Sequence, residues 1–109
     1  MQVTRIVAIC SEEPDWPIVI DAQIVADRIA PKTPFFGSWG KLGGEFSPFV
    51  LQPTGEMDFG SDYAETDRYF ECNIRSREIA QGAMFTVRKP DDDNRVREFV
   101  YVIRPFDNA

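Results

Sequence analysis

The chain has 109 residues, with 18 acidic and 12 basic side chains and a formal net charge of −6. This length predicts one domain, residues 1–109, with a single core that needs no disulfide or metal. The acidic balance argues against a nucleic-acid binder, because neutralising phosphates requires a basic surface. The sequence contains no histidine, which excludes histidine-dependent triads, imidazole acid–base catalysis and histidine metal ligands.

Membrane and disulfide signals are weak. The longest apolar runs, such as Phe99–Ile103, have about five residues, whereas a membrane-spanning helix needs roughly 20. The apolar patch near the N-terminus is too short for a signal peptide, so we expect a cytoplasmic protein without a membrane partner. Cys10 and Cys72 lie in apolar stretches without a CxxC pair. They favour core packing over a disulfide or a zinc site.

The first zone, Gln2–Ala30, holds two apolar stretches. Val3–Ile9 is rich in β-branched residues and predicts a strand. Pro17–Ala30 fits two periods: a β-branched beginning favours a strand, and its DAQIVADRIA end favours a helix. Period two aligns Ile18, Ile20, Ala22, Ile24 and Ala26, whereas period 3.6 aligns Ile18, Ala22, Val25, Ala26 and Ile29. We slightly favour the strand, and the helix alternative would make the fold α+β.

The second zone, Pro31–Gly55, combines four prolines, five glycines and five aromatic residues. This density predicts a long loop, which in a compact domain is usually functional or mobile. The aromatic side chains either plug one end of a β-barrel or stay exposed as a contact surface. The small domain favours the core role, because it needs its aromatic residues inside. GSWGKLGG in this zone lacks the spacing of a phosphate-binding loop, so we expect no nucleotide or other cofactor.

The third zone, Glu56–Phe106, alternates as β structure does. In RYFECNI the residues Phe70, Cys72 and Ile74 share one face. Ala83–Lys89 and Arg95–Arg104 predict two long paired strands, the second apolar on both faces at its centre like a central strand. The KPDDDN segment between them predicts a hairpin turn. A calcium loop would need a glycine and a later glutamate, so we expect no metal site.

Acidic residues follow the aromatic zone directly: Glu56, Asp58, Asp62, Glu65, Asp67 and Glu71. A solvated face is the ordinary role of such a run. The functional alternative is an acidic surface, edged by aromatic residues, that captures a basic protein. Its expected contact residues are Phe35, Phe36, Trp39, Phe46, Phe49, Glu56, Asp58 and Asp62. We therefore expect a small acidic non-enzymatic interaction module, such as an inhibitor, immunity-type or assembly protein.

A second hypothesis is a ligand-binding or weakly catalytic β-barrel. Arg75 and Arg77 lie two residues apart in NIRSRE and could hold an anionic small molecule. Pairing with neighbouring acids across strands is the more ordinary role for these arginines. For either hypothesis we expect a mainly β fold, a small barrel or sandwich of about five to seven strands with at most one helix. An exposed strand edge could pair two copies into a homodimer.

Overall fold

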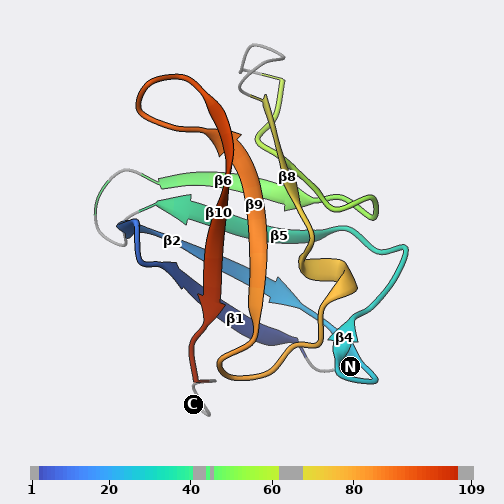
Figure 1. The fold of residues 1–109 in the computed structure, drawn as a ribbon. Coiled ribbons are helices and arrows are strands. Elements are labelled where there is room, and N and C mark those ends of the chain that lie inside the picture. The colour runs from blue at the N-terminus through green and yellow to red at the C-terminus, as the bar shows by residue number, and fades with distance from the viewer. Residues whose placement is uncertain (1–2, 41–43, 45, 62–67, 106–109) are drawn as a thin grey trace.

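The structure, a computed structural model, describes residues 3–40, 44, 46–61 and 68–105. Its main strands are β1 (Thr4–Cys10), β2 (Glu13–Ala22), β5 (Phe35–Gly40), β6 (Phe46–Leu51), β7 (Glu56–Asp58), β8 (Tyr69–Cys72), β9 (Met84–Pro90) and β10 (Val96–Ile103). They close into an antiparallel barrel in the order β1-β10-β9-β8-β7-β6-β5-β2 (Figure 1). The predicted mainly β barrel is confirmed, with slightly more strands than expected.

Alternation along the strands fills the barrel. Each strand sends every second side chain inward, because successive residues of a strand point to opposite faces. The inward residues of four strands illustrate this: Ile6, Ala8 and Cys10 of β1; Ile18, Ile20 and Ala22 of β2; Phe85 and Val87 of β9; Phe99, Tyr101 and Ile103 of β10. Cys10 is a buried free thiol and Cys72 a half-buried one, so the predicted core packing is confirmed for Cys10.

Pro17–Ala30 is β structure, and the helix alternative is wrong. The buried residues up to Ala22 follow period two. The chain then forms a small hairpin from β3 (Ile24–Val25) and β4 (Arg28–Ile29). Ala26 and Asp27 between them have φ angles of 51° and 64°. Two consecutive positive φ angles are the geometry of the tight turn that matches the twist of a hairpin.

The loop predicted for Pro31–Gly55 is also wrong, because most of this zone forms the β5–β6 hairpin. The two strands pair from Phe35 opposite Leu51 to Gly40 opposite Phe46. Gly37 of β5 lies where a larger residue would have no room for its side chain. A Cβ atom at Gly37 would lie 2.6 Å from both Phe49 Cζ and the Val19 carbonyl oxygen. The absent side chain leaves room for the ring of Phe49 inside the barrel.

The C-terminal hairpin forms as predicted. β9 and β10 pair from Met84 opposite Val102 to Pro90 opposite Val96. Asp91 holds the turn, since its Oδ1 accepts hydrogen bonds from the backbone N–H groups of Asp93 and Arg95, each at 2.9 Å. This is the local side chain-to-backbone bonding that favours aspartate in turns.

One detail of β10 differs from the expectation of a central strand. The outward side chains of Val96, Val100 and Val102 are exposed, because the outer face of a single barrel wall meets solvent. Every barrel strand also lies between two neighbours, which leaves little free edge, so the pairing of two copies through a strand edge stays a prediction. No helix in the described part of the chain is long and apolar enough to cross a membrane.

Candidate interaction surface

The outer side of the β5–β6 hairpin exposes two large aromatic side chains. Phe36 is 75% exposed and Phe46 is 60% exposed. Alternation explains which aromatic residues point outward. Phe36 on β5 and Phe46, Pro48 and Val50 on β6 face away from the barrel, and their intervening neighbours face inward. We call these four residues the aromatic face.

The aromatic face continues onto neighbouring strands. Phe36 lies opposite Val50 of β6 on one side and opposite Asp21 of β2 on the other. Val50 in turn lies opposite Asp58 of β7. A shallow surface groove runs along this row, lined by Phe36, Pro48, Phe49, Val50, Asp58, Phe59 and Gly60. The face thus has an apolar centre with a carboxylate on either side.

Both of these carboxylates are paired with arginines. Asp21 Oδ1 lies 2.8 Å from Arg5 Nε, and Asp58 Oδ1 lies 2.9 Å from Arg68 Nε. The Arg68 side chain, helped by the N–H of Gly60, lowers the pKa of Asp58 although partial burial opposes this. The Arg5 hydrogen bond likewise lowers the pKa of Asp21. The edges of the aromatic face are therefore ion pairs at neutral pH.

A second surface groove carries unpaired charge. Glu56, Glu71, Arg88 and Glu98 lie opposite one another in a row across β7, β8, β9 and β10. They line a surface hollow of about 480 Å³ together with Thr54, Gly55, Cys72, Asn73 and Thr86. Within the described residues no ion pair joins Arg88 to a glutamate of this row. We call Glu56, Glu71 and Glu98 the acidic row.

The predicted contact residues therefore divide. Phe36 and Phe46 lie at opposite ends of the aromatic face, and Asp58 lines the groove beside Phe36. Glu56 belongs to the acidic row, on the same strand as Asp58. Asp62 lies outside the described residues. The remaining three aromatic residues, Phe35, Trp39 and Phe49, face the interior and pack with the core. This division follows the alternation of side chains along β5 and β6, which we did not expect because the sequence predicted a loop here.

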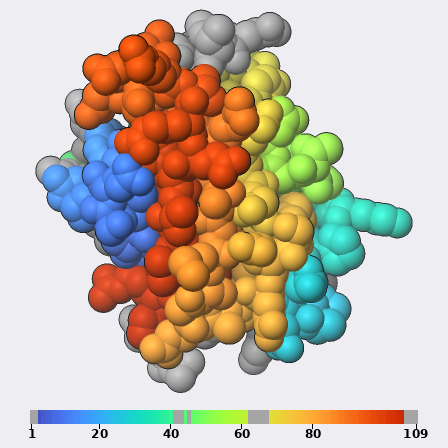
Figure 2. Space-filling view, viewed as in Figure 1, coloured from blue at the N-terminus to red at the C-terminus, as the bar shows by residue number. Residues whose placement is uncertain are grey.

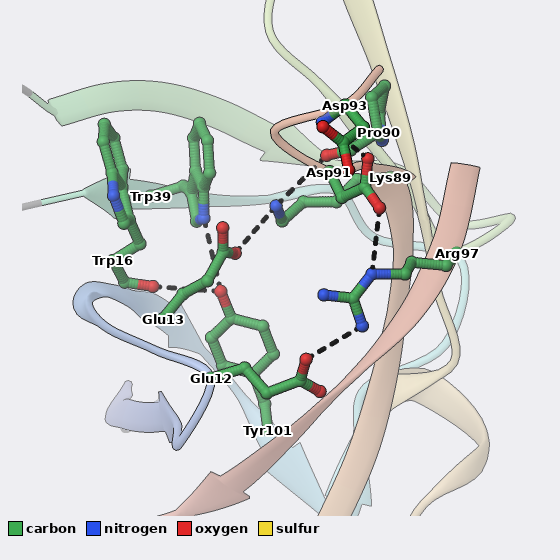
Figure 3. A network of polar contacts seen from close by, with 10 residues as sticks. All are labelled: Glu12, Glu13, Trp16, Trp39, Lys89, Pro90, Asp91, Asp93, Arg97 and Tyr101. Atoms are coloured by element: carbon green, nitrogen blue, oxygen red, sulfur yellow. Dashed lines mark hydrogen bonds and ion pairs between the residues drawn. The ribbon is translucent and has the colours of Figure 1, made fainter. Parts of the chain in front are cut away.

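Trp39 belongs to a polar network that closes one end of the barrel (Figure 3). Its ring stacks on Trp16 with centroids 4.5 Å apart, and its Nε1 donates to the Tyr101 hydroxyl at 3.3 Å. Tyr101 donates to the carbonyl of Trp16 at 3.0 Å. Burial raises the pKa of Tyr101 well above its usual value. This phenol is a structural crosslink rather than an accessible acid or base.

Lys89 lies at the centre of the same network and was missed in the sequence. It is 3% exposed, and its Nζ lies 2.7 Å from Glu13 Oε1. Figure 3 shows the ammonium group directed at the carboxylate of Glu13, the first residue of β2. The rings of Phe99 and Trp39 lie 4.0 Å and 5.2 Å from Nζ. The signal was present: Lys89 follows Phe85 and Val87 at period two on the inward face of β9.

Two more exposed ion pairs lie near Lys89, both made by Arg97. Arg97 of β10 contacts Glu12 in the β1–β2 turn at 2.8 Å and Asp91 in the β9–β10 turn at 3.2 Å. The two turns are thereby held against each other over the closed end of the barrel (Figure 3). This end is sealed by side chains, so we assign it a structural role.

Arg75 and Arg77, the expected anion ligands, donate to main-chain carbonyls. Arg75 Nε donates to Gln52 at 2.8 Å, Nη1 to Ala30 at 3.0 Å, and Nη2 to Leu51 at 3.1 Å and to Thr33. Burial lowers the pKa of Arg75. Arg77 Nε donates to Met84 at 3.0 Å. Arg75 thus ties η1 (Ile74–Ser76) to segments that are distant in sequence, which uses the donors that an anion would need.

Neither a metal-binding group nor a relative adds to the evidence for a function. Among the described residues there is no group of three or more histidine, cysteine, aspartate or glutamate side chains that could hold a metal ion. Comparison with family models, with curated proteins and with solved structures finds no match to the chain.

Proposed function

We propose that this protein is a small acidic non-enzymatic interaction module that binds another protein through the aromatic face. The observation that carries the proposal is the exposure of Phe36, 75% of which meets solvent on a regular strand. Burying such a side chain contributes roughly 1.5–3 kcal/mol. Phe36, Val50 and Pro48 adjoin one another beside the groove, so one partner could cover them together.

The anatomy of the surface supports this role. Protein interfaces combine a desolvated apolar centre with a polar rim, and they are enriched in aromatic residues and arginine. The aromatic face has this arrangement, with Arg5–Asp21 on one side and Arg68–Asp58 on the other. The rim pairs add little affinity but fix the orientation of a partner.

Charge favours a basic partner. The chain carries a net charge of −6, and the acidic row begins at Glu56 on β7, the strand that also supplies Asp58. A basic partner approaching the aromatic face would meet a field that raises its association rate at low salt. An inhibitor, immunity-type or assembly protein would each use such a surface.

The anion-binding barrel has less support. The barrel interior is occupied by large apolar side chains, and the donors of Arg75 are engaged by carbonyls. Neither Arg75 nor Arg77 lines the hollows beside Glu56, Phe36 or Val102. The interaction module is therefore the better supported hypothesis.

The test uses Phe36→Ala with Val25→Ala as the matched control. Val25 is also an exposed apolar residue, on the separate β3–β4 hairpin. Tagged wild-type protein and both variants are incubated with host lysate at low and high salt, and captured proteins are quantified by mass spectrometry. The dissociation constant of a recovered protein is then measured with purified components.

We expect a basic protein that is lost at high salt and binds Phe36→Ala about tenfold or more weakly, as expected of an interface hot spot. Val25→Ala should bind it as the wild type does. Recovery of no specific partner, or equal binding to wild type and Phe36→Ala, would contradict the proposal.

A further inference from the structure

A second exposed face lies on the wall formed by β9 and β10. In the strand order these two strands are opposite β5 and β6, and they occupy the front of the barrel in Figure 1. Figure 2 shows them as the middle of that side of the molecule. The outward residues are Met84, Thr86, Arg88 and Pro90 of β9 and Val96, Glu98, Val100 and Val102 of β10. We call these eight residues the β9–β10 face.

The β9–β10 face is unusually apolar for a solvent-facing wall. Met84 is 55% exposed, Val96 56%, Val100 46% and Val102 40%. Scattered apolar side chains on a surface are ordinary, but adjoining ones mark interaction sites. Val102 lies opposite Met84 and one outward position from Val100, so these three adjoin, whereas Val96 lies opposite Pro90 on the other side of the Arg88–Glu98 level. The face continues into a shallow apolar groove that Val102 lines with Ile9, Pro14 and Pro105.

The charges of the β9–β10 face indicate which kind of molecule would bind it. Arg88 and Glu98 are its only charged members, they lie opposite each other on adjacent strands, and both are exposed. In the described part of the chain neither takes part in an ion pair. Along β9 and β10 this pair has apolar residues on both sides, and Glu71 of β8 lies on the far side of Arg88. A surface that offers a cation beside an anion is complementary to a copy of itself in an isologous contact.

We propose that two copies of this chain pack through their β9–β10 faces. They are related by a two-fold axis that lies between the two faces, parallel to the strands and over the middle of the β9–β10 pair. This axis exchanges the two strand positions and preserves the level along them. It therefore places Glu98 against the partner's Arg88, and Arg88 against the partner's Glu98. At the next levels, Val102 meets the partner's Met84, and Val100 meets the partner's Thr86.

Packing geometry, charge and burial of apolar side chains all favour this arrangement of the two copies. Sheets pack face to face at about 10 Å with their strands roughly aligned, which this axis provides. Two reciprocal ion pairs replace charges that otherwise stay unpaired, and apolar side chains leave water on both sides. A face two strands wide makes a small interface, so the dimer is expected to be concentration-dependent. Because each copy carries a charge of −6, association is best measured at physiological ionic strength.

The test is a charge-swap experiment. Sedimentation velocity of the wild type, Arg88→Glu and Glu98→Arg is followed from low micromolar to submillimolar concentration. Each single variant faces like charge twice across the axis and should associate about tenfold or more weakly than the wild type. An equimolar mixture of Arg88→Glu and Glu98→Arg restores opposite charges at both positions, so it should form a heterodimer.

The mixture separates contact between copies from damage within a copy. Each variant also loses a cross-strand neighbour in its own hairpin, which costs about 0.2–1 kcal/mol of stability, and this loss is the same alone or mixed. Melting curves confirm that both variants are folded. A wild type that is monomeric at every concentration, or a mixture that associates no better than its components, would overturn the proposal. Binding of a different protein at this face in place of self-association would do the same.

Discussion

The ammonium group of Lys89 lies 2.7 Å from Glu13 Oε1 in the closed end of the barrel, 4.0 Å from the centre of the Phe99 ring. No hydrogen bond of good geometry reaches that oxygen among the described residues, although its distance to Lys89 is that of an ion pair. The oxygen is therefore satisfied by the charge of Lys89. The pair joins the first residue of β2 to β9, so it closes the barrel at the point where the two strands meet.

Removing one member of this pair should cost more than removing both. We expect Lys89→Met to lower the free energy of unfolding by about 3 kcal/mol, since it leaves a largely buried carboxylate without a counter-charge. The double variant Lys89→Met/Glu13→Gln should recover part of that loss. Urea unfolding of the two single variants and the double variant measures the coupling. Additive losses, or a loss below about 0.5 kcal/mol for Lys89→Met, would show that the pair does not hold the barrel end.

Gly37→Ala should destabilise the barrel although its backbone angles suit any residue. The added Cβ would lie 2.6 Å from Phe49 Cζ and from the carbonyl oxygen of Val19. Overpacking of this kind typically costs about 1–3 kcal/mol. Ser38→Ala, at the next position of β5, is the matched control and should change little. A thermal melt of Gly37→Ala that matches the wild type would mean that Phe49 can move away.

The pH dependence of the β9–β10 turn follows from Asp91. The N–H of Arg95, then that of Asp93 and the Arg97 side chain, lower the pKa of Asp91 below its usual 3.8. A carboxylate with a lowered pKa in the folded state stabilises the protein above its unfolded pKa, and this is lost as pH falls through the folded value.

Asp91→Asn should therefore melt at a lower temperature than the wild type at pH 7, and the two curves should converge as the pH falls below about 4. Asp92→Asn is the control, because in the described part of the chain no hydrogen bond to the Asp92 side chain occurs. A constant gap between Asp91→Asn and the wild type at all pH values would argue against the turn as the source.

Arg75 should behave as a structural clamp. Lysine cannot reach four carbonyls in the geometry of a guanidinium group, so Arg75→Lys leaves acceptors without partners. We expect a loss of about 2 kcal/mol in urea unfolding. Arg77→Lys, which removes a single exposed hydrogen bond to Met84, should cost much less. If phosphate or citrate instead raised the melting temperature of the wild type but not of Arg75→Lys, the anion-binding hypothesis would be favoured.

The sequence alone determined the class of the fold and much of its strand pattern. Alternation placed Ile18, Ile20, Phe85 and Val87 on inward faces, and turn chemistry placed a hairpin at Asp91. These features depend on residues a few positions apart, so the amino-acid types record them directly. The same alternation would have shown Lys89 pointing inward, had its charge not suggested an exposed position.

Tertiary structure decided the rest. The segment from Pro31 to Gly55 looks like a loop until Phe49 packs over Gly37, and that contact depends on pairing between β5 and β6. Arg75 resembles an anion ligand until its carbonyl partners are known, and these come from residues 23 to 45 positions away. Exposure of Phe36 likewise depends on barrel closure. Local pattern fixes which way a side chain points, but only long-range contacts decide what lies there.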